Sequence, residues 1–159
     1  MKKLVVTLCI ILSLFLVACS SIGEVKEKIS DCGYQEIDVI EMKDLTSTQQ
    51  YMANTILTEG KYTMLKTAIK DDKNAKISVF AKNSGIVFDY AIVVEFSSQK
   101  ALVDKINDDA NMLNLVKEIV GNYGDTVSLL KEKGAIYNNC FIYAKGPKKA
   151  QLYTALTAK

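Results

Sequence analysis

The segment over residues 76–96 constrains the fold of this chain more than any other part of it. Two stretches in which apolar side chains alternate with polar or small ones flank the sequence Lys82-Asn83-Ser84-Gly85. Alternation with a period of two is typical of β-strands, and a glycine allows the positive φ of a tight turn. The sequence therefore predicts a β-hairpin. One side of its second strand carries Asp89 and Glu95 among small apolar residues, so we expect that side to be only partly covered.

Helical spacing surrounds this hairpin. Apolar residues three or four positions apart predict helices over residues 45–70, with a candidate break at Glu59-Gly60, over 99–120, and over a short stretch before Gly134. Residues 136–144 alternate again. Residues 151–158 fit either a strand or a short helix, and we favour a strand, which would complete a second hairpin over about 136–157. Strands and helices in this order predict an α+β fold, with an antiparallel sheet and helices packed on one face.

The N-terminal segment indicates where the protein resides. Lys2-Lys3 precede an apolar run over residues 4–17, shorter than the roughly 20 residues that span a membrane. A charged start, an apolar middle and a small residue before a cleavage point are typical of a secretory signal peptide. The sequence Leu16-Val17-Ala18-Cys19 resembles the lipobox of bacterial lipoproteins.

The lipobox resemblance implies that residues 1–18 are removed and that Cys19 receives a diacylglyceryl thioether. The mature protein would then be held by lipid in the cell membrane, at its extracytoplasmic face. The alternatives are a plain signal peptide with an incidental cysteine, or a helix retained in the membrane. We interpret residues 19–44 as the lipidated cysteine followed by a tether or extended segment. Within it, 20–31 forms a short helix or a loose linker, and 35–42 a short strand or an extended stretch. Residues 45–159 are interpreted as a single domain.

Composition narrows the range of functions. Without residues 1–18 the remaining 141 residues carry 18 lysines and 18 acidic residues, so nothing predicts binding to nucleic acid. The chain has no histidine, the usual general base near neutral pH, and no arginine, the residue that grips phosphates with two parallel hydrogen bonds. Its motifs indicate no metal site and no phosphate loop, and we expect no cofactor.

Two cysteines and one aromatic segment are candidate features of the domain. Cys32 and Cys140 could form a disulfide outside the cell, although we favour two buried thiols. Aromatic and amide side chains near the end of the chain could form an exposed face that binds a peptide, a glycan or a protein, although we favour a face covered by helices. The residues of this candidate face are Tyr137, Asn139, Phe141 and Tyr143.

From Leu45 onward the order of elements behind a lipobox resembles small Gram-positive lipoproteins of unknown function. The resemblance lies in the strand pair over residues 76–96 and the segment over 138–158. The chain departs from the pattern at Gly146-Pro147-Lys148-Lys149, where an acidic residue followed by glycine is typical. Because that family has no assigned activity, the resemblance implies a fold and a location only.

These observations favour a lipid-anchored binding or accessory protein without catalytic activity. Its partners would be the membrane, through the lipid on Cys19, and a protein or peptide of the cell envelope. One alternative is an inhibitor or immunity-type lipoprotein that protects its own cell. The other is a hydrolase or transferase that uses carboxylates such as Asp89 and Glu95, or a Ser-Lys pair.

Overall fold

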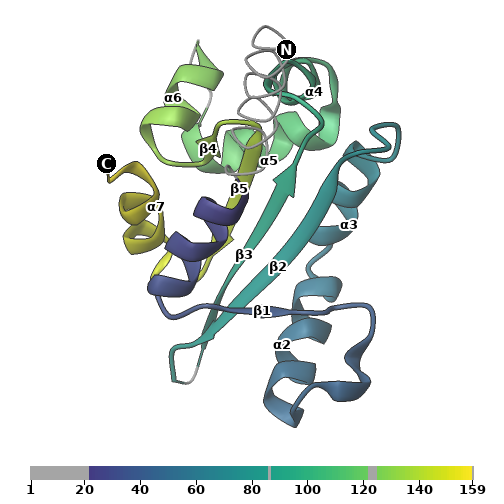
Figure 1. The fold of residues 1–159 in the computed structure, drawn as a ribbon, viewed down its shortest axis with the longest axis vertical. Coiled ribbons are helices and arrows are strands. Elements are labelled where there is room, and N and C mark those ends of the chain that lie inside the picture. The colour runs from purple at the N-terminus through teal and green to yellow at the C-terminus, as the bar shows by residue number, and fades with distance from the viewer. Residues whose placement is uncertain (1–21, 86, 122–124, 159) are drawn as a thin grey trace, which may run out of the picture.

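A five-stranded sheet forms the centre of the molecule (Figure 1). The computed structural model describes residues 22–85, 87–121 and 125–158. The strand order is β1-β2-β3-β5-β4, and each neighbouring pair is antiparallel. The α+β class and the antiparallel sheet predicted from the sequence are therefore confirmed. The strands are β1 (Gln35–Ile37), β2 (Lys76–Asn83), β3 (Phe88–Glu95), β4 (Ile136–Tyr137) and β5 (Cys140–Lys145).

The predicted hairpin is present as β2 and β3. Their register runs from Lys76 opposite Glu95 to Asn83 opposite Phe88. At the turn the side-chain oxygen of Asn83 accepts a hydrogen bond of 3.0 Å from the backbone N–H of Gly85, whose φ is +99°. The polar side chain and the glycine thus each take the part that the sequence assigned to this turn.

One face of the sheet is covered by helices from the middle of the chain. The expected helix over 45–70 is divided at Gly60, which has a φ of +77°. The expected helix over 99–120 is divided at Asp109, whose carboxylate accepts hydrogen bonds from the N–H groups of Asn111 and Met112 and so begins a new helix. The elements on this face are η1 (Met42–Asp44), α2 (Ser47–Thr58), α3 (Lys61–Ala68), α4 (Gln99–Asp108), α5 (Ala110–Val120) and α6 (Thr126–Glu132).

The opposite face is also covered, which differs from the expectation that helices pack on one face. A helix over residues 22–31 and α7 (Lys149–Thr157) pack there against Phe80 and Val93. The segment interpreted as a last strand is therefore a helix, and the second hairpin consists of β4 and β5 alone. The reason is packing, because Leu152 and Leu156 lie one helical turn apart and are both buried against this face.

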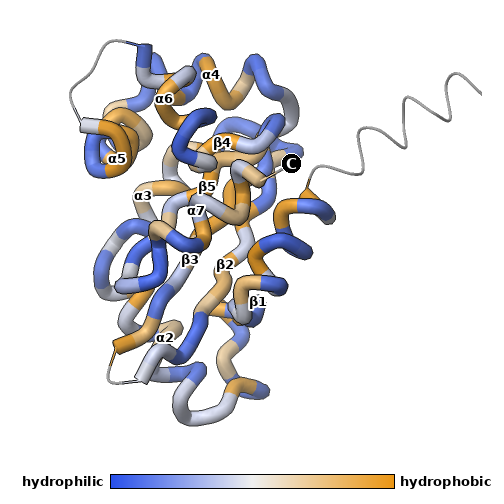
Figure 2. The backbone as a smooth tube through the Cα atoms, turned by 90° about the vertical axis from the view of Figure 1, so that its left-hand side faces the viewer, coloured by the Kyte–Doolittle hydropathy of each residue, from blue (hydrophilic) through white to orange (hydrophobic). Residues whose placement is uncertain are grey.

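Residues 22–44 belong to the fold, because the short helix and the short strand are the alternatives present here and a loose tether is not. β1 pairs with β2, and Val25 and Ile29 of the helix over residues 22–31 are fully buried. Figure 2 shows polar and apolar residues alternating along this helix, as expected for one buried side. In the described ranges no helix combines the length and apolarity needed to cross a membrane. Cys19 and the expected signal peptide lie outside these ranges.

Candidate functional site

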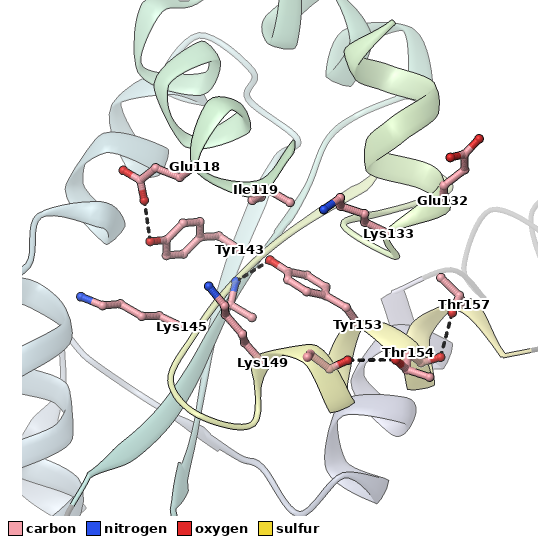
Figure 3. A pocket seen from close by; sticks show the side chains of 12 residues that line it. Glu118, Ile119, Glu132, Lys133, Tyr143, Lys145, Lys149, Tyr153, Thr154 and Thr157 are labelled. Carbon is pink, nitrogen blue, oxygen red and sulfur yellow. Dashed lines mark hydrogen bonds between the residues drawn. The ribbon is translucent and has the colours of Figure 1, made fainter. Parts of the chain in front are cut away.

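A groove of about 570 Å³ lies where β5, α5, α6 and α7 meet (Figure 3). Its walls combine lysine, glutamate, tyrosine and threonine side chains from elements far apart in the sequence. The residues that decide its chemistry are Glu118 from α5, Lys133 after α6, Tyr143 and Lys145 from β5, and Lys149 and Tyr153 from α7.

The outer edge of β5 runs along the groove. β4 pairs with β5 at Cys140 and Phe141. Farther along, the hydroxyl of Tyr153 takes the place of a partner strand. It accepts a hydrogen bond of 2.9 Å from the N–H of Ala144 and donates one of 3.3 Å to the carbonyl of Ile142. Because unpaired strand edges readily add further strands, this hydroxyl protects the edge of the sheet.

Two polar groups separate the groove from α2 and α3. Each joins a tyrosine hydroxyl and a lysine ammonium to one carboxylate. Tyr143 and Lys61 bind Glu118, whereas Tyr90 and Lys145 bind Glu59. The tyrosine hydroxyls lie 2.9 Å from Glu118 and 2.5 Å from Glu59. The two ring centroids are 6.4 Å apart, so the two groups form one rigid wall.

The three lysines of the groove differ in their ion pairs. Lys145 lies 2.8 Å from Glu59, whereas Lys133 and Lys149 form no ion pair with any residue that the structure describes. In Figure 3 both ammonium groups point toward the centre of the groove, and the carboxylate of Glu132 points away from it. Positive charge that is not neutralised within the protein, placed beside tyrosine rings, favours an anionic ligand.

Three groups of the groove, Glu118, Tyr143 and Tyr153, have pKa values shifted away from neutral pH. Burial opposes the ionisation of Glu118, but hydrogen bonds from Lys61 and Tyr143 outweigh it and hold the pKa of Glu118 below its ordinary value. Burial raises the pKa of Tyr143 above its usual range and that of Tyr153 to about 12. A general acid or base works best with a pKa near the working pH, so these groups suit binding better than proton transfer.

The candidate aromatic face does not exist as one surface. Tyr137 lies opposite Cys140 across the turn and shares its side of the sheet, whereas Phe141 and Tyr143 are buried on the other side. Asn139 lies in the turn, where its side-chain amide donates a hydrogen bond of 2.6 Å to the carbonyl of Phe96. The chain reverses between Tyr137 and Cys140, so alternation cannot be counted through this segment. Coverage by helices, the favoured alternative, applies to Phe141 and Tyr143.

The structure contradicts the disulfide and shows two free thiols. The carbonyl of Cys32 accepts a hydrogen bond from Lys82, which pairs with Asp89. Cys140 pairs with Glu95, six residues farther along β3. At about 3.3 Å per residue, the six steps along β3 from Asp89 to Glu95 span about 20 Å. Cys32 and Cys140 lie beside these two positions, so they are farther apart than the ~7 Å between Cα atoms that a disulfide can bridge. The buried-thiol alternative fits Cys140, since burial raises the pKa of its thiol to about 12.

Asp89 is fully buried, although we expected its side of β3 to be only partly covered. Its carboxylate accepts hydrogen bonds from the hydroxyl of Ser84 and from the N–H of Lys148, the latter at 2.5 Å. It therefore links two turns to the sheet. Glu95 lies at the other end of the strand, so these two acids do not form a carboxylate pair. The Ser84 hydroxyl likewise serves Asp89 and does not form a Ser-Lys pair.

A second hollow, of about 450 Å³, is lined largely by acidic side chains from α4 and from the loop before β2. Two of its aspartates, Asp72 and Asp109, have structural roles. Asp72 accepts hydrogen bonds from the N–H groups of Ser97 and Asn74, and Asp109 begins α5. Among the residues with described positions, no three His, Cys, Asp or Glu side chains are placed to bind a metal.

Comparisons with known proteins give no family for the chain. No protein-family model matches it, and neither a curated protein nor a solved structure shows significant similarity to it. The resemblance to small Gram-positive lipoproteins therefore stays a prediction.

Sequence reasoning missed the groove because its side chains come from separate short elements. Lys133 follows α6, and Lys149 and Tyr153 lie on the segment interpreted as a strand. One signal was present. Leu152 and Leu156 are four residues apart, and so are Lys149 and Tyr153. In a helix this spacing places each pair on one side, which would have directed Lys149 and Tyr153 to a common surface.

Proposed function

We propose that this chain is a lipid-anchored, extracytoplasmic binding protein whose groove takes an acidic segment of another envelope protein. The observation that carries the proposal is the pair Lys133 and Lys149, two ammonium groups that form no ion pair with a described residue and are directed into a groove beside Tyr143 and Tyr153. The anchor rests on the sequence before Cys19.

An acidic peptide suits the groove for two reasons. Its carboxylates would pair with Lys133 and Lys149, and its apolar atoms would lie against the half-buried ring of Tyr153. Charge complementarity at an exposed surface mainly sets specificity and the rate of association, so binding should weaken as salt is added. An inhibitor or immunity-type role would use the same contacts and differ only in the identity of the partner.

Binding is favoured over catalysis by the state of the polar groups in the groove. Glu118 is held by Tyr143 and Lys61, and the hydroxyl of Tyr153 is engaged by the edge of β5. A nucleophile needs an adjacent base that can take its proton. Here the Glu118 carboxylate holds the wall of the groove together, and the Tyr153 hydroxyl pairs with the edge of β5.

Site-specific photo-crosslinking in membranes of the native host tests the groove. A photoreactive amino acid replaces Thr154, which lines the groove, or Thr48, which lies at the start of α2 and away from it. We expect an acidic envelope protein to be captured from position 154 and not from position 48. The double substitution Lys133→Glu with Lys149→Glu should abolish capture. The control Lys131→Glu, in α6 two residues before Lys133, should not. Capture that survives the double substitution would refute the proposed site.

The anchor is tested separately through Cys19. The substitution Cys19→Ala removes the thiol that accepts lipid, so we expect the protein to lose metabolic labelling with radioactive palmitate. Cell fractionation then compares how much of the native chain and of the Cys19→Ala protein is found with the membrane. Labelling that persists in the Cys19→Ala protein would refute lipidation at this residue without affecting the proposed groove.

A further inference from the structure

The chain leaves almost no slack between the proposed lipid and the folded domain. In the sequence, Ser20 and Ser21 lie between Cys19 and Ile22, the first described residue of the helix over residues 22–31. Three Cα-to-Cα steps cover at most about 11 Å. A lipid on Cys19 therefore holds the first turn of this helix close to the bilayer.

The helix over residues 22–31 cannot unwind cheaply to lengthen that link. Val25 and Ile29 are fully buried, and exposing side chains of this size costs roughly 1.5–3 kcal/mol each. Its first turn is also fixed to β4, because Glu24 accepts a hydrogen bond from the hydroxyl of Tyr137. The ammonium of Lys28 lies 5.8 Å from the centroid of the same ring. The helix is part of the core and does not act as a tether.

These contacts define which end of the sheet lies nearest to the anchor. The helix begins beside β4 and ends beside Lys82, which donates a hydrogen bond to Cys32. At the β4 end, Phe96 and Asn139 are joined by a backbone hydrogen bond of 3.0 Å, so residues 97–99 lie next to the β4–β5 turn. We call residues 97–99 and this turn the anchor end. The far end is the β2–β3 turn, at the opposite end of the two long strands in Figure 1.

We propose that the anchor end rests on the membrane surface and that the β2–β3 turn projects away from it. This inference rests on the proposed lipidation of Cys19. The eight paired positions of β2 and β3 separate the two ends by about 23 Å at ~3.3 Å per residue. The floor of the groove, over residues 143–145, begins three residues beyond Cys140 at the anchor end, or about 10 Å. The acidic segment of the partner would therefore bind close to the bilayer.

The short link, and not charge attraction, would hold this orientation. Asp72, whose carboxylate accepts a hydrogen bond from Ser97, places the acidic hollow at the anchor end. Anionic lipid would repel these side chains, so the zwitterionic lipid phosphatidylcholine is the appropriate surface for a test.

Fluorescence quenching on vesicles measures the orientation directly. The full lipidated chain, with Cys32→Ala to leave no accessible native thiol, carries a bimane label at Gln99→Cys in the anchor end or at Val87→Cys near the far end. Both native residues are exposed. The vesicles are phosphatidylcholine that contains a headgroup nitroxide quencher. We expect severalfold stronger quenching at position 99 than at position 87. A Gly-Ser spacer of about 20 residues between Ser21 and Ile22 spans roughly 25 Å and should remove that difference.

Each alternative outcome has its own meaning. Equal quenching at the two positions, or a difference that the spacer leaves unchanged, in protein that floats with the vesicles overturns the orientation but leaves the lipid anchor standing. If the unlabelled full chain does not float with the vesicles and carries no lipid by mass spectrometry, the anchor itself is refuted. A larger difference on phosphatidylglycerol than on phosphatidylcholine would overturn the argument that the link, and not charge, sets the orientation.

Discussion

The two faces of the sheet are built in different ways. The face under α2 to α6 is covered by consecutive elements between residues 42 and 132, whereas the opposite face is covered by the two ends of the described chain. Four helices of the first face begin at a side-chain cap, at Thr46, Ser98, Asp109 and Asp125. Helix α7, on the second face, begins at Lys148 without one. Local signals thus specify the first face, and long-range packing specifies the second.

The largest effect should come from removing packing on the second face. The substitution Ile29→Ala deletes a fully buried side chain and should lower the free energy of unfolding by about 3–4 kcal/mol. Leu102→Ala, on the first face and equally buried, should cost about as much. Guanidinium unfolding followed by circular dichroism measures both. If residues 22–31 were a tether, Ile29→Ala would behave like the exposed control Glu27→Ala and change nothing.

A smaller loss is expected at the turn before α7. Gly146 has a φ of +117°, and a Cβ atom there would lie 2.7 Å from the Cα of Asp89. We expect Gly146→Ala to cost about 3 kcal/mol, because it combines backbone strain with a clash against a buried strand. Gly85→Ala is the matched control. Its φ is +99° but the space around it is open, so about 1 kcal/mol is expected. Equal losses in thermal unfolding would show that the contact with Asp89 is unimportant.

The sequence predicted those elements whose signals are local. Alternation and Gly85 identified the β2–β3 hairpin, and Gly60 and Gly134 marked helix ends that the structure contains. The break at Asp109 was missed because the apolar spacing continues through it. Its carboxylate caps α5. A side chain that caps a helix and one that faces water look alike in a sequence without coordinates.

The second face and the groove depended on information that the sequence does not display locally. The five apolar or aromatic residues in segment 151–158 are compatible with both periods, and only contact with the sheet selects the helix. The burial of Asp89 depends on donors from Ser84 and Lys148, the second of which is 59 residues away. The groove in turn requires α7 to be a helix. Because α7 was interpreted as a strand, the sequence could not predict the candidate site.

The edge of β5 joins the two faces, and its protection should have a modest effect. Tyr153→Phe removes the hydroxyl that pairs with Ala144 and Ile142, leaving a partly buried N–H without its partner. We expect a loss of about 1–2 kcal/mol in urea unfolding. Tyr51→Phe, at a ring that is 66% exposed, is the control and should change stability by less than ~0.5 kcal/mol. Faster hydrogen exchange at Ala144 in Tyr153→Phe would locate the effect, and unchanged exchange would contradict it.

The smallest expected effect is on the pH dependence of stability, and it comes from two carboxylates on the first face of the sheet. The hydrogen bonds from lysine and tyrosine overcome burial and hold the pKa values of Glu59 and Glu118 below the ordinary value of 4.5. A carboxyl group whose pKa is lower in the folded state stabilises that state at pH values above 4.5, and this stabilisation is lost as the pH falls through the folded pKa.

We therefore expect the stability of the double variant Glu59→Gln, Glu118→Gln to depend less steeply on pH below 4.5 than that of the native chain. Both carboxylates are partly exposed, so water screens their contribution and the change in slope will be small. The control is Glu132→Gln, whose carboxylate points away from the groove. Midpoints of urea unfolding between pH 3 and 7 measure the slope. A double variant with the slope of the native chain would show that acid acts elsewhere, and that the polar wall beside the groove positions side chains without setting acid stability.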